Sequence, residues 1–374
     1  MKRIILQCLL IGLSAQLVLG AYQLGDHPRI LINKAMLPSL VAKATGGGML
    51  GDDYASIKAE ADWVVANGQF RNSPNKYLRL NEMICTALVY LVERERGNES
   101  ASVYADAVKN LWGDGTVMST SGTEQFGCYA IAYDWIYDAL SASERKLFGD
   151  QLAPWLNHYT NTPEIILQYG DFLYNQTWGP EHLSTPHCRD GITPKLFVAL
   201  AVAGAGTDYE SEAIQNLDSF DSRIPADCLP RFDLMGGVWS ESMGHGTYGP
   251  TRVIPWAFEA WRTATGLNWF ELGEDDTFLK EMNHWAVHTT VPYSGLTACI
   301  DDNYSTRTLE ECWYMTAPIL GARYGDEVAN YVSASYDDGS WPDNIWRMPW
   351  VRFITYDPEV PKPVSYTHLR AHET

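Results

Sequence analysis

The sequence predicts an all-α protein, and three observations lead to that fold class. Apolar residues recur at steps of three and four along most of the chain between Met36 and Tyr324. Capping signals precede several of these stretches, and glycines follow them. No series of alternating strands lies between them, which argues against an α/β fold.

Ten stretches carry the helical pattern, and their ends agree with it. Ser141 and Glu144 form a capping box, and Thr193 before Pro194 fits an N-cap and a first helical residue. Glycines stand where helices should end, at Gly97, Gly204 and Gly266. The predicted helices are 54–67, 81–94, 102–111, 128–139, 142–159, 194–205, 209–220, 251–265, 276–291 and 310–324.

About ten or more helices with short connections and no repeat of fixed length are typical of an (α/α) toroid. We expect such a toroid, with a catalytic cleft at one end, over residues 21–340. After Tyr324 the pattern changes, and residues 351–356 resemble a strand. Residues 341–363 are therefore expected to begin a C-terminal β domain that is cut short, which leaves the toroid protein incomplete.

The two ends of the chain are expected to lie outside the folded domain. Lys2 and Arg3 precede an apolar stretch that ends in small residues, which predicts a signal peptide over residues 1–20 and an exported protein, periplasmic or secreted. A membrane anchor is the alternative, but the stretch is short and interrupted by Ser14 and Gln16. No later stretch predicts a stable membrane span. Residues 364–374 back-translate into a transposase sequencing adapter, which indicates an artefact.

The charge of the chain limits its partners. The formal net charge is −19, so nucleic acid is repelled and is not an expected partner. The cysteines are scattered without a CxxC pair, and no metal site or cofactor is required by the visible sequence. Asp301, Asp302 and Asn303 fit either a calcium site or, more commonly, a capped turn.

Two polar, turn-rich segments, 174–191 and 236–252, hold most of the chemistry. Each comes just before an apolar helical stretch, and catalytic groups tend to lie on loops held by a rigid scaffold. Trp178 and Trp239 lie in them, where aromatic faces are able to stack on sugar rings. The candidate polar residues are Asn175, His182, His187, Asp190, Glu241, His245, Tyr248 and Arg252.

Several motifs resemble heparinase II/III-like and related alginate lyase proteins. They are His27-Pro-Arg-Ile-Leu-Ile32, Ala87-Leu-Val-Tyr-Leu91, Ala130-Ile-Ala-Tyr-Asp-Trp-Ile-Tyr-Asp138, Leu140-Ser-Ala-Ser-Glu-Arg145 and Gly236-Gly-Val-Trp-Ser-Glu241 with Tyr248. The resemblance implies an α/α toroid followed by a β-sandwich domain. It also implies β-elimination of a uronate-containing polysaccharide, and it leaves room for a structural divalent metal in the domain beyond.

The resemblance also implies roles for particular residues. His187 matches the position where the family has an Asn or His, and Tyr248 matches its catalytic Tyr. Many relatives have a Tyr where this chain has His245, so the identity of the base stays open. The usual Asn is absent, unless Asn175 or His182 replaces it.

The chemistry of β-elimination gives the remaining roles. A group must neutralise the uronate carboxylate, a base removes the C5 proton, and an acid protonates the leaving oxygen. We assign Tyr248 as acid, and the role of base is open to it as well. His187 is assigned as base or neutralising group with Asp190 orienting it, and His245 is the rival base. Arg252 would bind carboxylate or lower the Tyr248 pKa. Structural alternatives are an Asp190 helix cap, an Arg252–Glu241 pair and a surface His182.

Two other functions stay open at the level of sequence. A glycoside hydrolase on the same scaffold would use Glu241 with Asp190 or Asp302 as its carboxylate pair. A non-catalytic glycan-binding protein would bind uronate polymers without degrading them. Of the three, the lyase is the function that the resemblance implies.

Overall fold

The protein is all-α over the residues that its computed structural model describes, which are 22–70, 76–113, 123–160, 189–237, 250–272, 277–288, 316–335 and 349–361. No β-strand occurs in these ranges. The α-helices are α2 (Leu37–Thr45), α3 (Met49–Asn67), α4 (Lys76–Glu95), α5 (Ser102–Gly113), α6 (Thr123–Trp135), α7 (Ala142–Leu152), α10 (Arg189–Val202), α11 (Glu210–Arg223), α12 (Leu229–Met235), α14 (Pro250–Thr265), α15 (Thr277–His288), α17 (Ala317–Tyr324), α18 (Glu327–Ser335) and α19 (Pro349–Thr355).

Every helix that the periodicity predicts overlaps a helix of the structure. The Ser141 capping box is confirmed, since Ser141 Oγ accepts from Glu144 N and Glu144 Oε2 accepts from Ser141 N at 2.7 Å. Gly97, Gly204 and Gly266 each have φ near 76° after a helix end, a conformation that favours glycine. The short helices α2, α12 and α18 were not predicted, because nine or fewer residues give too little periodicity to recognise.

Two predictions about helix boundaries and strands are wrong. Helix α10 begins at Arg189, so Thr193 and Pro194 are not its N-cap and first residue, and Pro194 lies inside the helix. Residues 349–355, expected to enter a β domain, form helix α19. All seven residues of α19 are buried, so its sequence has no polar face from which a helical period could be read.

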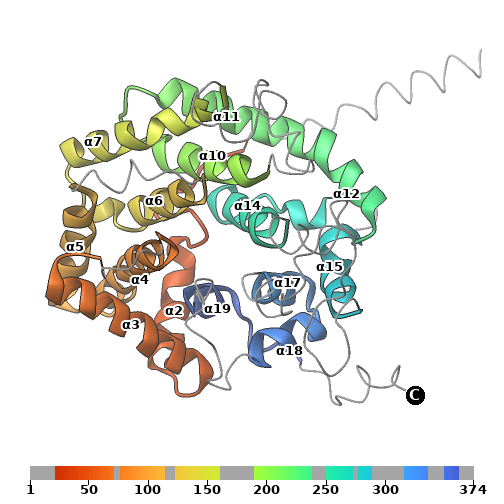
Figure 1. Ribbon diagram of the computed structural model, residues 1–374, viewed down its shortest axis with the longest axis horizontal. Helices are drawn as coiled ribbons and strands as arrows, with labels where there is room; N and C mark the ends of the chain where they lie inside the picture. The colour runs from red at the N-terminus through yellow and green to blue at the C-terminus, as the bar shows by residue number, and fades with distance from the viewer. Residues whose placement is uncertain are drawn as a thin grey trace, which may run out of the picture.

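The helices contact one another in a circuit. Helices α4, α6, α10, α14, α17 and α19 pack in that order, and α19 returns to α4 and α3 (Figure 1). Helices α3, α5, α7, α11, α12, α15 and α18 lie further out in the same view. Among the helices of the described residues, none combines the length and apolar character needed to cross a bilayer.

A non-helical segment, residues 22–33, ties the carboxyl ends of α6, α10 and α14 together; we call it the N-terminal strap. It contacts Asp134 and Trp135 from α6, Leu200 and Ala203 at the end of α10, and Thr263 and Ala264 from α14. Because these three helices pack side by side and end at one place, they run parallel. Their amino ends therefore share the opposite end of the molecule.

Asp134 is the central group of the strap contacts. Its side chain is completely buried, and its Oδ1 lies 2.6 Å from Nδ1 of His27. Its Oδ2 accepts the backbone N–H groups of Arg29 and Ile30, both at 2.8 Å. The His27 ring stacks on Tyr137 with the ring centroids 3.7 Å apart. One carboxylate thus fixes the path of the strap at His27, Arg29 and Ile30.

Arg29 completes the strap by capping a helix. Its buried guanidinium donates from Nε to the Leu200 carbonyl at 2.8 Å and from a second nitrogen to the Ala203 carbonyl. A cation at the carboxyl end of a helix satisfies the last carbonyls and complements the helix dipole. Thr263 Oγ1 donates to the Arg29 carbonyl at 2.7 Å, which links α14 to the same residue.

A buried ion pair joins α3, near the amino end of the chain, to α19. Arg352 of α19 donates from Nε to Asp53 Oδ2 at 2.7 Å and from a second nitrogen to Asp53 Oδ1 at 2.5 Å. Both side chains are about 5 % exposed, and the residues are 299 positions apart. Arg352 also donates to the Ser333 carbonyl of α18 at 3.1 Å. This bidentate contact fixes the junction of α3, α18 and α19.

We predict that Asp134→Ala destabilises the fold by about 3–5 kcal/mol, because three buried donors lose their acceptor. The matched control is Asp138→Ala. Asp138 pairs with Arg94 at 2.8 Å at the partly exposed end of α4, so its loss should cost about 1 kcal/mol or less. Urea unfolding measures both, and equal losses would contradict the central role of Asp134.

Stability should also depend on the protonation of His27. Burial lowers the pKa of His27 below its ordinary 6.5, while Asp134 opposes that shift. The folded state then binds fewer protons than the unfolded state, so the unfolding free energy decreases as the pH falls below about 6.5. His27→Asn keeps a donor for Asp134 but does not titrate. Urea unfolding at about pH 8 and about pH 5 should show a smaller decrease for this variant than for the native chain.

Candidate functional site

Most residues of the sequence-predicted site lie outside the described residues. These are Asn175, Trp178, His182, His187, Trp239, Glu241, His245 and Tyr248. Asp190 and Arg252 lie within helices, as the second residue of α10 and the third residue of α14. Asp190 does not cap a helix that begins at Thr193, because α10 already begins at Arg189.

Helices α10 and α14 begin at the same end of the molecule, and each follows one of the two polar segments in the sequence. The helices pack against each other, and both end at the N-terminal strap. Gly127, early in α6, faces Pro194 and Phe197, early in α10, which confirms that α6 and α10 are parallel. The first residues of α10 and α14 therefore share the end opposite the strap, and each polar segment leads into one of them.

Because the helices are parallel, their amino ends all contribute partial positive charge to this end of the molecule. Helix α4 ends beside α6, since Arg94 near its end pairs with Asp138 just after α6. Helix α17 ends beside the end of α14, where Tyr324 Oη donates to the Phe270 carbonyl. Aligned peptide dipoles leave partial positive charge at helix amino ends. An anionic group is favoured there, whereas Arg29 compensates the opposite end.

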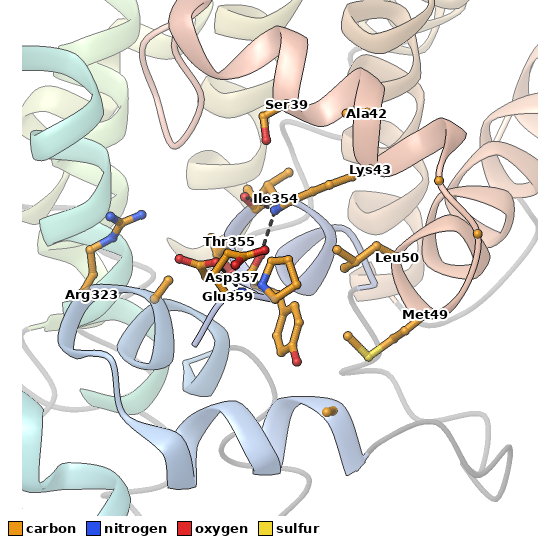
Figure 2. Close-up of a pocket in the computed structure, with 16 residues that line it drawn as sticks. Ser39, Ala42, Lys43, Met49, Leu50, Arg323, Ile354, Thr355, Asp357 and Glu359 are labelled. Atoms are coloured by element: carbon orange, nitrogen blue, oxygen red, sulfur yellow. Dashed lines mark hydrogen bonds between the residues drawn. The ribbon is translucent and has the colours of Figure 1, made fainter. Parts of the chain in front are cut away.

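A second candidate site is a cavity that no sequence motif indicates. It has a volume of about 830 Å³ and lies between the α2–α3 turn and the helices α17, α18 and α19 (Figure 2). Asp190 and Arg252, the predicted site residues that lie in described helices, are not among the residues that line it. Its polar lining residues are Ser39, Lys43, Arg323, Thr355, Asp357 and Glu359.

Lys43 reaches into this cavity and caps α19. Its ammonium lies 3.1 Å from the Phe353 carbonyl and 2.8 Å from the Tyr356 carbonyl. Burial lowers the pKa of Lys43 to about 8; Arg323 adds to this shift and Asp357 opposes it. A lysine in a cavity with a pKa this low is the kind of group that binding sites use.

Arg323 forms the opposite wall and is held from behind by a buried carboxylate. Its Nε lies 2.9 Å from Oε2 of Glu259, and a second nitrogen lies 3.2 Å from Oε1. Glu259 is completely buried and also accepts two bonds from Arg262, at 3.0 and 2.6 Å. Two guanidinium groups thus share one carboxylate beside the cavity. Burial lowers the pKa of Arg323, with Glu259 opposing the shift.

Almost nothing in the sequence indicates this cavity. Lys43 and Arg323 are 280 positions apart and occupy ordinary polar positions near helix ends. Only the spacing Glu259-x-x-Arg262 suggested an ion pair on one helix face. On α15, His284 lies 3.6 Å from Asp326. Within the described ranges, no group of three His, Cys, Asp or Glu residues is placed to hold a metal ion.

The comparisons with known proteins add no relative. No protein-family model matches the sequence, and no curated protein is significantly similar to it. The likeness to heparinase II/III-like and alginate lyase proteins therefore rests on the motifs alone. His27, Arg29 and Asp134, which carry part of that likeness, meet in the strap contacts and have a structural role here.

Glu259→Gln should be strongly destabilising, because it leaves two half-buried guanidinium groups beside a neutral amide at a buried position. We expect a loss of about 3–5 kcal/mol in the unfolding free energy, as for breaking a buried ion pair. Glu271→Gln, at an exposed position after α14, is the matched control and should change it by about 0.5 kcal/mol or less. Chemical denaturation compares the two, and a neutral effect of Glu259→Gln would contradict the shared-carboxylate arrangement.

Proposed function

We propose that this chain is a polysaccharide lyase built on an α/α toroid, which cleaves a uronate-containing polysaccharide by β-elimination. The contact circuit of α4, α6, α10, α14, α17 and α19 supports the toroid. One observation carries the function: α10 and α14 begin at the same end of the molecule, directly after the two polar segments. A cleft at this end would receive catalytic groups from both segments.

Chain connectivity limits how far the two principal residues lie from these helices. His187 is two residues before Arg189, and Tyr248 is two residues before Pro250. Since consecutive Cα atoms are about 3.8 Å apart, each lies within about 7.6 Å of the first Cα of its helix. The neighbouring helix starts therefore support a shared site for His187 and Tyr248.

The proposed reaction uses the roles that the sequence suggests. Tyr248 protonates the oxygen that leaves C4, and His187 or His245 removes the C5 proton. Asp190, on the first turn of α10, would orient His187. Arg252, on the first turn of α14, would neutralise the uronate carboxylate and stabilise the charge that develops in the transition state.

Binding of an acidic polymer needs a local positive field, because the chain itself carries a net charge of −19. The aligned amino ends of the parallel helices supply part of that field. Asn175, His182, Trp178 and Trp239 would complete the sugar contacts. Binding of the polymer should consequently weaken at high salt. Charges are already screened beyond about 8 Å at physiological ionic strength, and added salt shortens this distance.

The experiment is a screen of uronate polymers for products that absorb in the near ultraviolet, which an elimination yields and a hydrolysis does not. Tyr248→Phe should lower kcat by about 10²–10⁴-fold, because the acid is removed. Tyr209→Phe is the matched control: Tyr209 precedes α11 at the strap end of α10, and activity should change less than about twofold.

Two other outcomes would replace the lyase proposal. Cleavage without an absorbing product, lost in Glu241→Gln but kept in Tyr248→Phe, identifies a glycoside hydrolase with Glu241 and a second carboxylate. Binding of a uronate polymer without fragments, unchanged in Tyr248→Phe, identifies a glycan-binding protein.

A further inference from the structure

The cavity between the α2–α3 turn and α17–α19 lies at a different place in the fold from the proposed cleft. Arg323 comes from the last turn of α17, and that turn lies beside the segment after α14. The cavity therefore opens near the carboxyl ends of these helices, whereas the proposed cleft lies at the amino ends of α10 and α14. Its volume of about 830 Å³ is within the range of small-molecule sites.

The charges around the cavity do not cancel. Lys43 and Arg323 line its inner part together with Asp357, while Glu259 behind Arg323 pairs with Arg262 outside the lining, so two lining cations face one carboxylate. Glu359 lies exposed at the rim, where water screens its charge. The inner part of the site therefore has one surplus positive charge in a chain that is strongly acidic.

The two positive side chains, Lys43 and Arg323, are held in place by contacts within the protein. Figure 2 shows Lys43 reaching in from α2 and Arg323 from α17 on the other side. The contacts with Glu259 fix one edge of the Arg323 guanidinium, which has five donors in total. Lys43 is fixed by the carbonyls at the end of α19. A ligand that bridges the two walls would meet groups already in place.

We propose that this cavity binds a small hydroxylated monocarboxylate, such as a sugar acid, at a site separate from the proposed catalytic cleft. The ligand carboxylate pairs with Arg323 and approaches Lys43, which supplies the missing negative charge. Its hydroxyl groups donate to Asp357 and Glu359, and Ser39 is available to either partner. Met49, Leu50 and Ile354 provide the apolar part of the lining against which a sugar ring packs.

The balance of charges favours a monoanion over a dianion. One surplus positive charge is compensated by one carboxylate, while a phosphate ester would bring a second negative charge beside Asp357. A neutral sugar would leave the surplus charge unpaired. The site should therefore rank glucuronate above both glucose 6-phosphate and glucose.

Calorimetric titration of the full chain with these three probes tests the ranking. Glucuronate should bind, and glucose and glucose 6-phosphate should each bind at least about tenfold more weakly. Binding should also weaken as the pH rises through about 8, where Lys43 loses its charge beside Asp357 and Arg323. Absence of glucuronate binding, or equal binding of glucose, would overturn the proposal.

Substitutions locate the site. Arg323→Gln should weaken glucuronate binding about 10- to 100-fold, because charge-assisted hydrogen bonds are lost while Arg262 still pairs with Glu259. The control Arg94→Gln removes a half-exposed ion pair elsewhere and should leave the affinity unchanged. Unchanged affinity in Arg323→Gln would place the ligand elsewhere.

A variant that gains affinity separates binding from folding defects. Asp357→Asn keeps an oxygen to accept the Glu359 N–H at the turn, and it raises the surplus charge by one. Glucuronate should bind roughly twofold to fivefold more tightly, and glucose 6-phosphate should gain more than glucuronate. Weaker binding of both anions in this variant would contradict the charge argument. Because this site and the proposed lyase cleft share no residues, either proposal is able to fail without the other.

Discussion

The buried carboxylate of Asp134 is the contact on which the arrangement of the inner helices depends. It accepts from two backbone N–H groups of the strap and from His27, at a position with no exposure to water. An unpaired carboxylate would be costly there, so the strap must follow one path. On that path Arg29 reaches the end of α10, and Thr263 of α14 reaches the strap. Three helices are thereby aligned in one direction.

This alignment gives the molecule two chemically different ends. At carboxyl ends, helix carbonyls are compensated by cations: the buried Arg29 on α10 and the half-buried Lys43 on α19. At the other end, helix amino termini remain and the polar segments enter. The helix dipole therefore underlies both proposals. The amino ends of helices favour an anionic polymer. The carboxyl ends attract cations, and a cavity becomes positive where these cations outnumber the carboxylates.

The junction of α2 and α3 with α19 brings together groups that are far apart in the sequence. Asp53 with Arg352 and Lys43 with the carbonyls of α19 connect positions about 300 residues apart. The ion pair is bidentate and fully enclosed, so it specifies a register between α3 and α19. The cavity lies beside this junction, and its charges depend on helices that meet only when the circuit closes.

Local chemistry determined a large part of this protein before any tertiary contact. Helical periodicity, the Ser141 capping box and the glycine stops depend on residues within a few positions, and the structure confirms them. Local sequence patterns also placed the candidate groups of the proposed cleft in two segments. They did not show that α10 and α14 begin at the same end of the molecule. That follows from the strap.

Tertiary structure alone decided the remaining features, because their causes are not local. Helix α19 is buried on every side, so its sequence resembled a strand, and burial rather than period fixed it as a helix. The start of α10 at Arg189 overrode a plausible capping signal at Thr193. The roles of Asp134 and Arg323 depend on partners distant in sequence. Sequence by itself specified the helices and their candidate groups, and packing specified their direction, their ion pairs and the cavity.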